Sequence, residues 1–278
     1  MDNLQPSFVG LLLYYFLPYR KKVIKKNIQQ VFDGYLSLAQ QKKLMKAFYS
    51  HLATSLKEII QLRFIREKTL CQRVEIRGQE HLLKVANENK GILVLTGHFG
   101  NWEFAPIGGI LNFKSFQGHF HFIRRTLGMK WIERLLFRRY YAAGLQVIPK
   151  KNSLDQVCQA LEKNHAVVFV LDQHASLVNR DGIAVEFFGK KAGTYRSLAT
   201  LSGYTGVPVI PAATFRLANG RHVLEFYPPI AFQDQGSQKA SLYQNTLAYN
   251  QALEKILLTH PEQWHWLHKR WKLSTADS

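Results

Sequence analysis

The pattern of apolar and polar positions changes along the chain at about residue 70. In the N-terminal part, apolar side chains recur every three or four positions, which predicts helix, as at Leu44, Phe48, Leu52, Leu56 and Ile59. After residue 72, short β-branched runs predict strands at 73–78, 91–96, 145–149, 166–172, 207–215 and 222–227. Segments with helical spacing separate these runs, for example 128–144 and 153–165.

Strands that are apolar along their whole length and alternate with helices are typical of an α/β fold. We expect a mixed, mostly parallel sheet flanked by helices. The predicted organisation is an N-terminal membrane-associating helical region over 1–70 and an α/β domain over 71–278, with a loop at 232–241.

Near the C-terminus, the segment "HPEQWHWLHKRW" predicts a helix. Pro261 suits the first helical position, and Trp264, Leu267 and Trp271 would then share one face. Core packing is the expected role of that face, with membrane contact as the alternative.

Residues 8–18 form an apolar run that a basic cluster follows. The run is too short to cross a bilayer, which requires about 20 residues. A secretory signal carries its positive charges before the apolar run, whereas here they follow it, at Arg20, Lys21, Lys22, Lys25 and Lys26. This order favours an interfacial anchor, in which residues 8–26 contact an anionic membrane surface. The alternative is a buried N-terminal helix with a solvated basic end.

Composition predicts a folded protein with an acidic partner. Apolar residues make up 46% of the chain and charged residues 20%. The 37 Lys and Arg exceed the 19 Asp and Glu, for a net charge of +18. Nucleic acid would account for the charge but not for the apolar N-terminus, so we do not expect it as a partner. Cys71 and Cys158 lack metal-ligand spacing and fit buried positions in a reducing compartment.

The stretch "TGHFGNWE" follows the apolar run at 91–95. Its His98 and Glu103 would point about 140° apart on a continuous helix, so they meet only if His98 lies in a turn before the helix that carries Glu103. Gly100 permits such a turn, and Asn101 is a good N-cap. A carboxylate bonded to one imidazole nitrogen fixes the tautomer and makes the other nitrogen a base.

No serine stands near this histidine, and no G-x-S-x-G pattern occurs. The pair would therefore activate a hydroxyl of the substrate; the alternative is a capped corner with a satisfied histidine. Metal-binding patterns are also lacking, because the pairs His119/His121 and His265/His268 have no further ligands at informative spacing. We expect no metal and no cofactor, and place His119 and His121 on one face of a strand.

Six motifs in order resemble those of the lipid A biosynthesis acyltransferases (the lauroyl and myristoyl transferases) of the lysophospholipid acyltransferase superfamily. The similarity covers nearly the whole chain. The motifs are "LPYRKKVIKKNIQQVF", "GHFGNWE", "FIRR" with "LFRRYYAAGLQVIPK", "VVFVLDQH", "VEFFGKKAGTYRSLATLSGYTGVPVIPA" and "HPEQWHWLHKRWK".

The resemblance implies transfer of a fatty acyl group from an acyl carrier protein or coenzyme A thioester to a lipid hydroxyl. It also implies a location at the cytoplasmic face of the inner membrane. By position, His98 is the general base, Glu103 its partner, and Arg124 a contact to substrate phosphate. Further substrate-binding residues are expected at Asn101, Asp172, Gln173, Phe187, Phe188 and Thr194.

Other interpretations stay open. Phe187 and Phe188 fit core packing as well as an acyl pocket. His174 stands where these enzymes often have a second aspartate. This departure leaves related acceptors open beside a lipid A precursor, such as another glycolipid, a lysolipid or an amino lipid. The competing functions are a lipid-binding or tethering protein with a vestigial site, and an acyl-thioesterase in which water replaces the acceptor.

Overall fold

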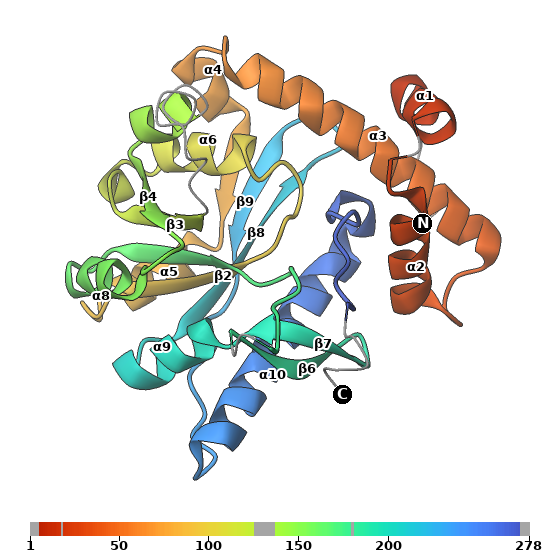
Figure 1. Ribbon diagram of the computed structural model, residues 1–278. Helices are drawn as coiled ribbons and strands as arrows, with labels where there is room; N and C mark the ends of the chain where they lie inside the picture. The colour runs from red at the N-terminus through yellow and green to blue at the C-terminus, as the bar shows by residue number, and fades with distance from the viewer. Residues whose placement is uncertain (1–5, 18, 125–136, 179–180, 273–278) are drawn as a thin grey trace.

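The computed structural model describes residues 6–17, 19–124, 137–178 and 181–272 (Figure 1). The N-terminal part is helical, as predicted, with α1 (Phe8–Phe16), α2 (Lys21–Phe32), α3 (Leu38–Leu62) and α4 (Glu67–Gln72). The later helices are α5 (Gln79–Ala86), α6 (Phe104–Asn112), α8 (Leu154–Glu162), α9 (Ser197–Thr205) and α10 (Gln238–Thr259). Short 3₁₀ turns occur at Lys114–Phe116 and Pro261–Gln263.

The strands form one large sheet and one hairpin. The large sheet has seven strands in the order β1-β9-β8-β2-β5-β3-β4, and β6 pairs with β7. Their bounds are β1 (Val74–Arg77), β2 (Ile92–Thr96), β3 (Phe120–Arg124), β4 (Leu145–Pro149), β5 (Ala166–Val170), β6 (Gly182–Phe187), β7 (Lys190–Tyr195), β8 (Val209–Arg216) and β9 (His222–Phe226).

The sheet is mixed but mostly parallel, which confirms the predicted fold class. Strands β8, β2, β5, β3 and β4 run parallel to one another. At the other edge, β9 pairs antiparallel with β8, and β1 pairs parallel with β9. The carboxyl ends of β2 and β5 therefore lie side by side, with Thr96 opposite Val170. Polar groups that follow these two strands meet at one edge of the sheet.

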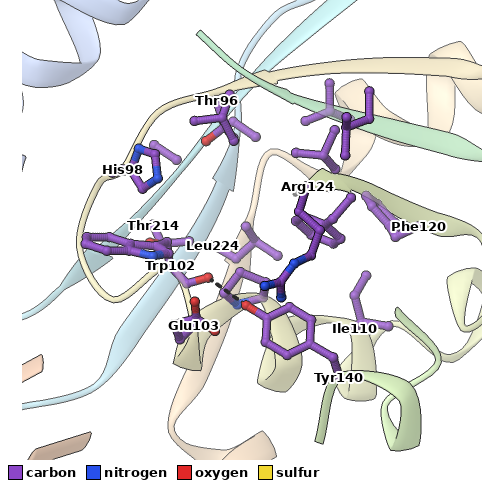
Figure 2. A pocket seen from close by; sticks show the side chains of 18 of the residues that line it. Thr96, His98, Trp102, Glu103, Ile110, Phe120, Arg124, Tyr140, Thr214 and Leu224 are labelled. Carbon is purple, nitrogen blue, oxygen red and sulfur yellow. Dashed lines mark hydrogen bonds between the residues drawn. The ribbon is translucent and has the colours of Figure 1, made fainter. Parts of the chain in front are cut away.

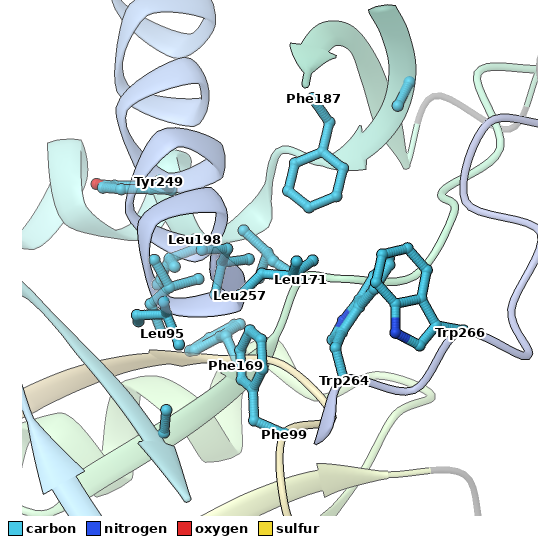
Figure 3. Close-up of a cluster of buried hydrophobic side chains, with 14 of the residues drawn as sticks. Leu95, Phe99, Phe169, Leu171, Phe187, Leu198, Tyr249, Leu257, Trp264 and Trp266 are labelled. Atoms are coloured by element: carbon cyan, nitrogen blue, oxygen red, sulfur yellow. The ribbon is translucent and has the colours of Figure 1, made fainter. Parts of the chain in front are cut away.

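Alternating side chains of the central strands enter two separate cores. Leu95 and Phe169 pack on one face with α9, α10 and the Trp264 region (Figure 3). Val94 and Val168 pack on the opposite face with α4, α5 and α6. Both faces are thus buried, which explains why these strands read as continuous apolar runs rather than alternating ones.

The two N-terminal helices α1 and α2 pack along the first half of α3 (Figure 1). Gly10 lets α1 approach closely, because a Cβ atom at this position would collide with Ser50 of α3. Within the described residues, every helix is too short or too polar to cross a bilayer. The exposed side of α1 is apolar, with Phe8, Leu12 and Phe16 in solvent.

One sequence prediction differs from the structure, one element was not predicted, and one prediction lies partly outside the described residues. Pro261 begins only a 3₁₀ turn, after which the chain is extended. A helix cannot form there because backbone groups pair elsewhere: the Trp266 carbonyl accepts from Asn27 of α2. The β6–β7 hairpin, formed by 182–195, was not predicted. Of the helix expected at 128–144, residues 128–136 lie outside the described part.

Candidate active site

The turn after β2 has the conformation that the spacing of its residues predicts. Gly100 has φ +55°, and a side chain there would meet the backbone of Thr214 on β8. The Asn101 side chain then accepts hydrogen bonds from the backbone N–H groups of Glu103 (3.3 Å) and Phe104 (3.1 Å). This confirms Asn101 as the cap of the helix that follows, although regular helix begins at Phe104, one residue after Glu103.

The carboxylate that contacts His98 belongs to Asp172, just after β5. His98 Nδ1 lies 2.9 Å from Asp172 Oδ1, and the backbone N–H of His98 donates to Oδ2 at 2.7 Å. Trp264 Nε1 donates to the same Oδ2 at 2.9 Å. Asp172 is thereby fixed by three hydrogen bonds in a position where only 3% of its side chain is exposed. Nδ1 carries the proton in this arrangement, which leaves Nε2 as the acceptor.

The prediction that Glu103 accepts this hydrogen bond from His98 is therefore wrong. Glu103 is half-buried at the start of α6 and lines the cavity beside His98. The reason is topological: β2 and β5 are neighbours, so the side chain that follows β5 reaches the turn that follows β2. The sequence identified both strand ends but not their adjacency.

Opposing effects set the charge state of His98 and Asp172. Burial lowers the pKa of His98, but the charge and hydrogen bond of Asp172, together with the charge of Glu103, raise it above its usual value. Burial raises the pKa of Asp172, but His98 and Trp264 hold it well below its usual range. Asp172 is therefore ionised at neutral pH and stabilises the protonated imidazole.

Other side chains surround the imidazole. Gln173 Nε2 lies 3.5 Å from His98 Nε2, so this predicted residue stands beside the free nitrogen. The rings of Trp102 and His265 lie 5.0 and 5.7 Å from the His98 ring. Burial and the nearby His98 lower the pKa of His265 to about 4, so it is neutral at neutral pH.

A largely apolar cavity of about 440 Å³ extends from His98 between the sheet and α6 (Figure 2). This volume lies within the range of about 300–1,000 Å³ that is usual for small-molecule pockets. Ile110 and Phe120 lie away from His98 in the view of Figure 2, and Arg124 projects between them and Glu103. Apolar side chains from several strands complete the wall, among them Val94, Phe122, Val147, Val168, Leu224 and Phe226.

Arg124 and Tyr140 are the polar groups on the far side of this cavity from His98. The Arg124 guanidinium lies 3.4 Å from the centre of the Phe137 ring, which holds it by a cation–π contact. Tyr140 Oη lies 3.4 Å from the Trp102 carbonyl oxygen. Burial and the charge of Glu103 raise the pKa of Tyr140, so it stays a neutral donor.

The remaining predicted site residues lie away from the cavity. Phe187 is 1% exposed and packs against Trp264 and Trp271. Phe188 bonds Glu254 through its backbone N–H. Thr194 is fully buried and accepts from Arg270 at 2.7 Å. The structure gives these three residues packing positions.

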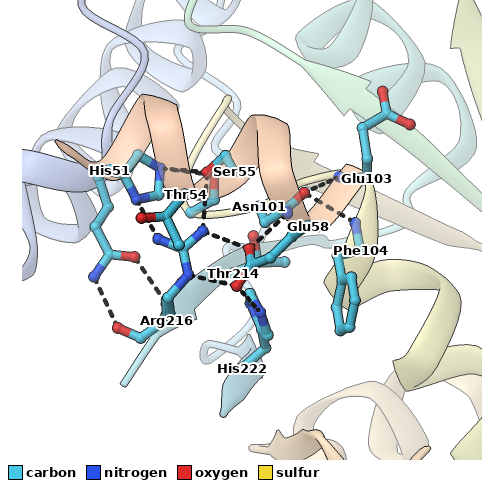
Figure 4. Close-up of polar contacts among 12 residues, drawn as sticks. His51, Thr54, Ser55, Glu58, Asn101, Glu103, Phe104, Thr214, Arg216 and His222 are labelled. Carbon is cyan, nitrogen blue, oxygen red and sulfur yellow. Dashed lines mark hydrogen bonds and ion pairs between the residues drawn. The ribbon is translucent and has the colours of Figure 1, made fainter. Parts of the chain in front are cut away.

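A buried polar network joins α3 to the turn that carries His98 (Figure 4). Glu58 of α3 accepts from Asn101 (2.8 Å) and forms an ion pair with Arg216 of β8 (2.5 Å). His222 of β9 lies 3.2 Å from the same carboxylate. His51 of α3 donates to the Gly100 carbonyl (3.1 Å). Two successive residues of the turn are thus fastened to α3.

The contacts within this network determine the protonation states of Glu58 and His51. Burial raises the pKa of Glu58, but hydrogen bonds from His222 and Arg216 outweigh it and hold that pKa below its usual range. Burial and the Arg216 charge lower the pKa of His51 to about 3. His51 is therefore neutral, accepts from Arg216 through Nδ1 (2.9 Å) and donates through Nε2.

Three histidines away from the site, His119, His121 and His165, contact one another. His121 Nε2 lies 2.9 Å from His165 Nδ1, and His119 stacks on His165. His119 and His121 thus both contact His165, which agrees with the prediction that they lie on one face of a strand. Within the four described ranges, no three His, Cys, Asp or Glu side chains are arranged to hold a metal ion.

Sequence reasoning missed Trp264 as the support of Asp172, and Tyr140 as a lining residue. Trp264 follows the 3₁₀ turn and forms an isolated bridge with Phe99, beside His98. The Trp of "PEQW" was interpreted as part of a helical core face, so its indole N–H received no role. A buried indole N–H requires an acceptor, and this requirement is the signal that points to a nearby carboxylate.

Similar proteins identify the family. Residues 5–273 match the family model of the bacterial lipid A biosynthesis acyltransferases. The chain is 26% identical to the lipid A biosynthesis lauroyltransferase of Escherichia coli (strain K12) over 268 residues, which cover 95% of this chain and 83% of that protein. It is 23% identical to the palmitoleoyltransferase of the same strain over 271 residues, 95% and 82% of the two chains.

A relative with a different acceptor in its name also matches. The phosphatidylinositol mannoside acyltransferase of Mycolicibacterium smegmatis (strain ATCC 700084 / mc(2)155) is 21% identical over 242 residues, 84% of this chain and 74% of that protein. The family model covers nearly the full length, including the turn with His98, the end of β5 with Asp172 and the segment with Trp264. The chain therefore belongs to the bacterial lipid A biosynthesis acyltransferase family.

Proposed function

We propose that the protein transfers a fatty acyl group from an acyl carrier protein or coenzyme A thioester to a hydroxyl of a lipid acceptor, with His98 as general base. The observation that carries this proposal is the bond between His98 Nδ1 and buried Asp172, at the mouth of an apolar cavity. The bond orients the imidazole, and the cavity offers room for an acyl chain. Among the described residues that line the cavity there is no serine or cysteine, and this supports a nucleophile that comes from the substrate.

In the proposed reaction, His98 Nε2 takes the proton of the acceptor hydroxyl as its oxygen attacks the thioester carbonyl. A tetrahedral oxyanion forms and collapses, which breaks the C–S bond. His98 then returns the proton to the departing thiolate, so the ester and the free thiol are the products. Asp172 stabilises the imidazolium between these two proton transfers.

Arg124 supplies the positive charge that the developing oxyanion, or a phosphate of the acceptor, requires. Backbone N–H groups at the start of α6 are less suited to this role, because those of Glu103 and Phe104 already donate to Asn101. Glu103 lines the cavity beside His98, and its charge raises the pKa of His98 and of Tyr140.

Membrane contact through residues 8–26 is part of the proposal. The outer side of α1 exposes Phe8, Leu12 and Phe16, and α2 begins with Lys21 and Lys22. An apolar helix face next to basic side chains suits the boundary between acyl chains and anionic headgroups. We propose that this contact holds the protein on the cytoplasmic face of the inner membrane, where its acceptor would be embedded.

The acceptor is a glycolipid. Two relatives are named for lipid A biosynthesis and a third for a phosphatidylinositol mannoside, so sugar-bearing acceptors with phosphate are common to the names. His174 follows Gln173 in the sequence, at the position where the resemblance to the lipid A enzymes implies a second aspartate, so related acceptors stay open. We propose a lipid A precursor or a related phosphoglycolipid.

Product analysis tests the function directly. Purified protein would be incubated with acyl carrier protein thioester or acyl-CoA and with vesicles that contain mixed lipid acceptors, and the products identified by mass spectrometry. We expect a new acylated lipid and an equal amount of free thiol. Free fatty acid without acylated lipid would identify a thioesterase, and lipid binding with neither product would identify a tethering protein.

The cavity is expected to set acyl chain length. Ile110→Trp fills the space near Phe120, so the preferred donor should become shorter, with kcat/KM for the longest accepted donor falling about 10–200-fold. Phe120→Ala enlarges the same region and should shift the preference to longer donors. Competition among thioesters of different length measures both shifts. Unchanged preference in both folded variants would show that the acyl chain lies elsewhere.

A further inference from the structure

The second half of α3, together with Phe64 just after its end, exposes apolar side chains, although the helical pattern would have placed several of them in a core. We call Leu56, Ile59, Ile60 and Phe64 the α3 patch; their exposed fractions range from 38% for Ile59 to 76% for Phe64. Leu44 and Phe48, earlier in the same helix, are buried. Exposed helix faces normally carry polar side chains, so the patch requires a partner or a non-aqueous environment.

The patch continues the side of α3 that α1 covers. Tyr49 contacts Tyr14 of α1, and Lys46 lies over the same ring. Leu56 follows Tyr49 by seven residues and Ile60 follows Lys46 by fourteen, so each lies within about 40° of a residue that contacts α1. Leu56 and Ile60 are therefore on the same side of α3 as the residues that contact α1, nearer to its C-terminal end.

The two apolar surfaces adjoin. The N-terminal end of α1 is nearest to the patch, because the backbone N–H of Ser7 donates to Ser50 whereas Tyr14 lies further back, beside Tyr49 and Lys46. Phe8 is exposed at that end of α1. The exposed N-terminal end of α1 is thus directed along α3 toward the patch, and Figure 1 shows α1 lying beside α3.

Charge around these surfaces is almost entirely positive. Of the two acidic residues between 6 and 66, Glu58 is buried and only Asp33 remains on the surface. The same segment holds eleven basic residues: Arg20, Lys21, Lys22, Lys25, Lys26, Lys42, Lys43, Lys46, Lys57, Arg63 and Arg66. An apolar surface within such a basic segment is complementary to an anionic bilayer, whose acyl chains accept the former and whose phosphates accept the latter.

We propose that the α3 patch is a second membrane-inserting surface, continuous with α1, so that the protein lies on an anionic bilayer along one whole side of α3. The proposal rests on the proposed function in one respect, that the protein works at a membrane. Because Glu58 and His51 fasten α3 to Asn101 and Gly100, this contact fixes the catalytic turn relative to the bilayer. A single contact through α1 would leave the molecule free to tilt.

Vesicle binding by the full-length protein tests the proposal without any need for activity. Ile60→Asp/Phe64→Asp removes the exposed apolar groups and adds negative charge, and should weaken sedimentation with phosphatidylcholine–phosphatidylglycerol vesicles about tenfold or more. Leu154→Asp is the matched control: this side chain is 61% exposed and belongs to α8, a helix that lies away from α3 (Figure 1). The vesicle binding of this variant should equal that of the wild type.

A probe at the patch gives an independent readout. Ile60→Cys would be labelled with nitrobenzoxadiazole in a Cys71→Ser/Cys158→Ser background, and its emission should shift to the blue when the vesicles are added. Leu154→Cys, labelled in the same way, should not respond. Equal vesicle affinity of the wild type and the double Asp variant, or an unshifted spectrum, would overturn the proposal.

The other possible occupants give different results, each of which would overturn the proposal. If the patch binds a second copy, the wild type sediments as a dimer in solution and the double Asp variant as a monomer. If it binds an acidic carrier protein, the variant raises the KM for that donor and keeps its vesicle affinity. If the double Asp variant loses vesicle binding but the wild type transfers no acyl group, only the proposed function is refuted and the membrane contact of the α3 patch stands.

Discussion

Asp172→Asn is expected to lower kcat about 10²–10⁴-fold in a protein that stays folded. An amide at this position presents an N–H group to His98 Nδ1, so the imidazole must place its own proton on Nε2. That tautomer cannot accept the proton of the acceptor hydroxyl. The initial rate of lipid acylation, measured with saturating donor, gives the effect, and circular dichroism of the variant checks the fold.

The pH dependence of the rate distinguishes an Asp172 that orients and charges His98 from an Asp172 that only stabilises the fold. His98 acts as a base only when neutral, and its raised pKa places the acidic limb of the wild-type profile above pH 6.5. Without the Asp172 charge, burial lowers the pKa of His98, so the limb of Asp172→Asn moves to lower pH. Glu103→Gln should move it in the same direction by less, because Glu103 is the weaker contributor to that pKa.

Trp264→Phe is the graded control. It removes one hydrogen bond from Asp172 and leaves the bond to His98 in place, so its rate should lie between those of the wild type and Asp172→Asn. A larger shift of the acidic limb in Glu103→Gln than in Asp172→Asn would return the role of orienting carboxylate to Glu103.

Glu58→Ala is expected to destabilise the protein by about 3–5 kcal/mol, because it leaves Arg216 charged and without its carboxylate in a buried position. The side chains of Glu58 and Arg216 are only 4% and 12% exposed, so solvent screens the pair little. Thermal unfolding should show a Tm lower by roughly 10 °C. Asn101 and His222 lose the same partner, which adds to the effect.

A double variant distinguishes the ion pair from general loss of packing. Glu58→Leu/Arg216→Met removes both charges and keeps much of the apolar volume, so it should be more stable than Glu58→Ala. The Glu58 contribution also has a definite pH dependence. Its folded pKa is depressed, so its stabilisation is present above the unfolded pKa of about 4.3 and is lost as pH falls below it. A Glu58→Ala variant with the wild-type Tm would contradict this account.

The sequence predicted the fold class well because its strands are apolar on both faces. The positions of β2, β5 and β8 follow from their β-branched runs, and buried parallel strands require helices on both sides. The β6–β7 hairpin gave no such signal, since its second strand, "KKAGTY", mixes charged and small residues. The segment after Pro261 has helical spacing, but its backbone is needed to contact His98 and α2.

Prediction of the candidate site from sequence succeeded within one strand and failed between strands. The turn with His98, Gly100 and Asn101 has the expected geometry because neighbours in sequence determine it. The partner of His98 was misassigned because Asp172 is 74 residues away, and nothing in one sequence shows that β2 and β5 are adjacent. The role of Glu58 could not be predicted for the same reason, because its contacts with Asn101 and Arg216 span 43 and 158 residues of sequence.

The most direct test of the central claim compares wild-type protein with His98→Ala on the same vesicles, donor and acceptors. We predict that the wild type forms acylated lipid and that folded His98→Ala forms it about 10²–10⁴-fold more slowly, with unchanged vesicle binding. Acylated lipid formed by folded His98→Ala at the wild-type rate would contradict the claim that His98 is the general base.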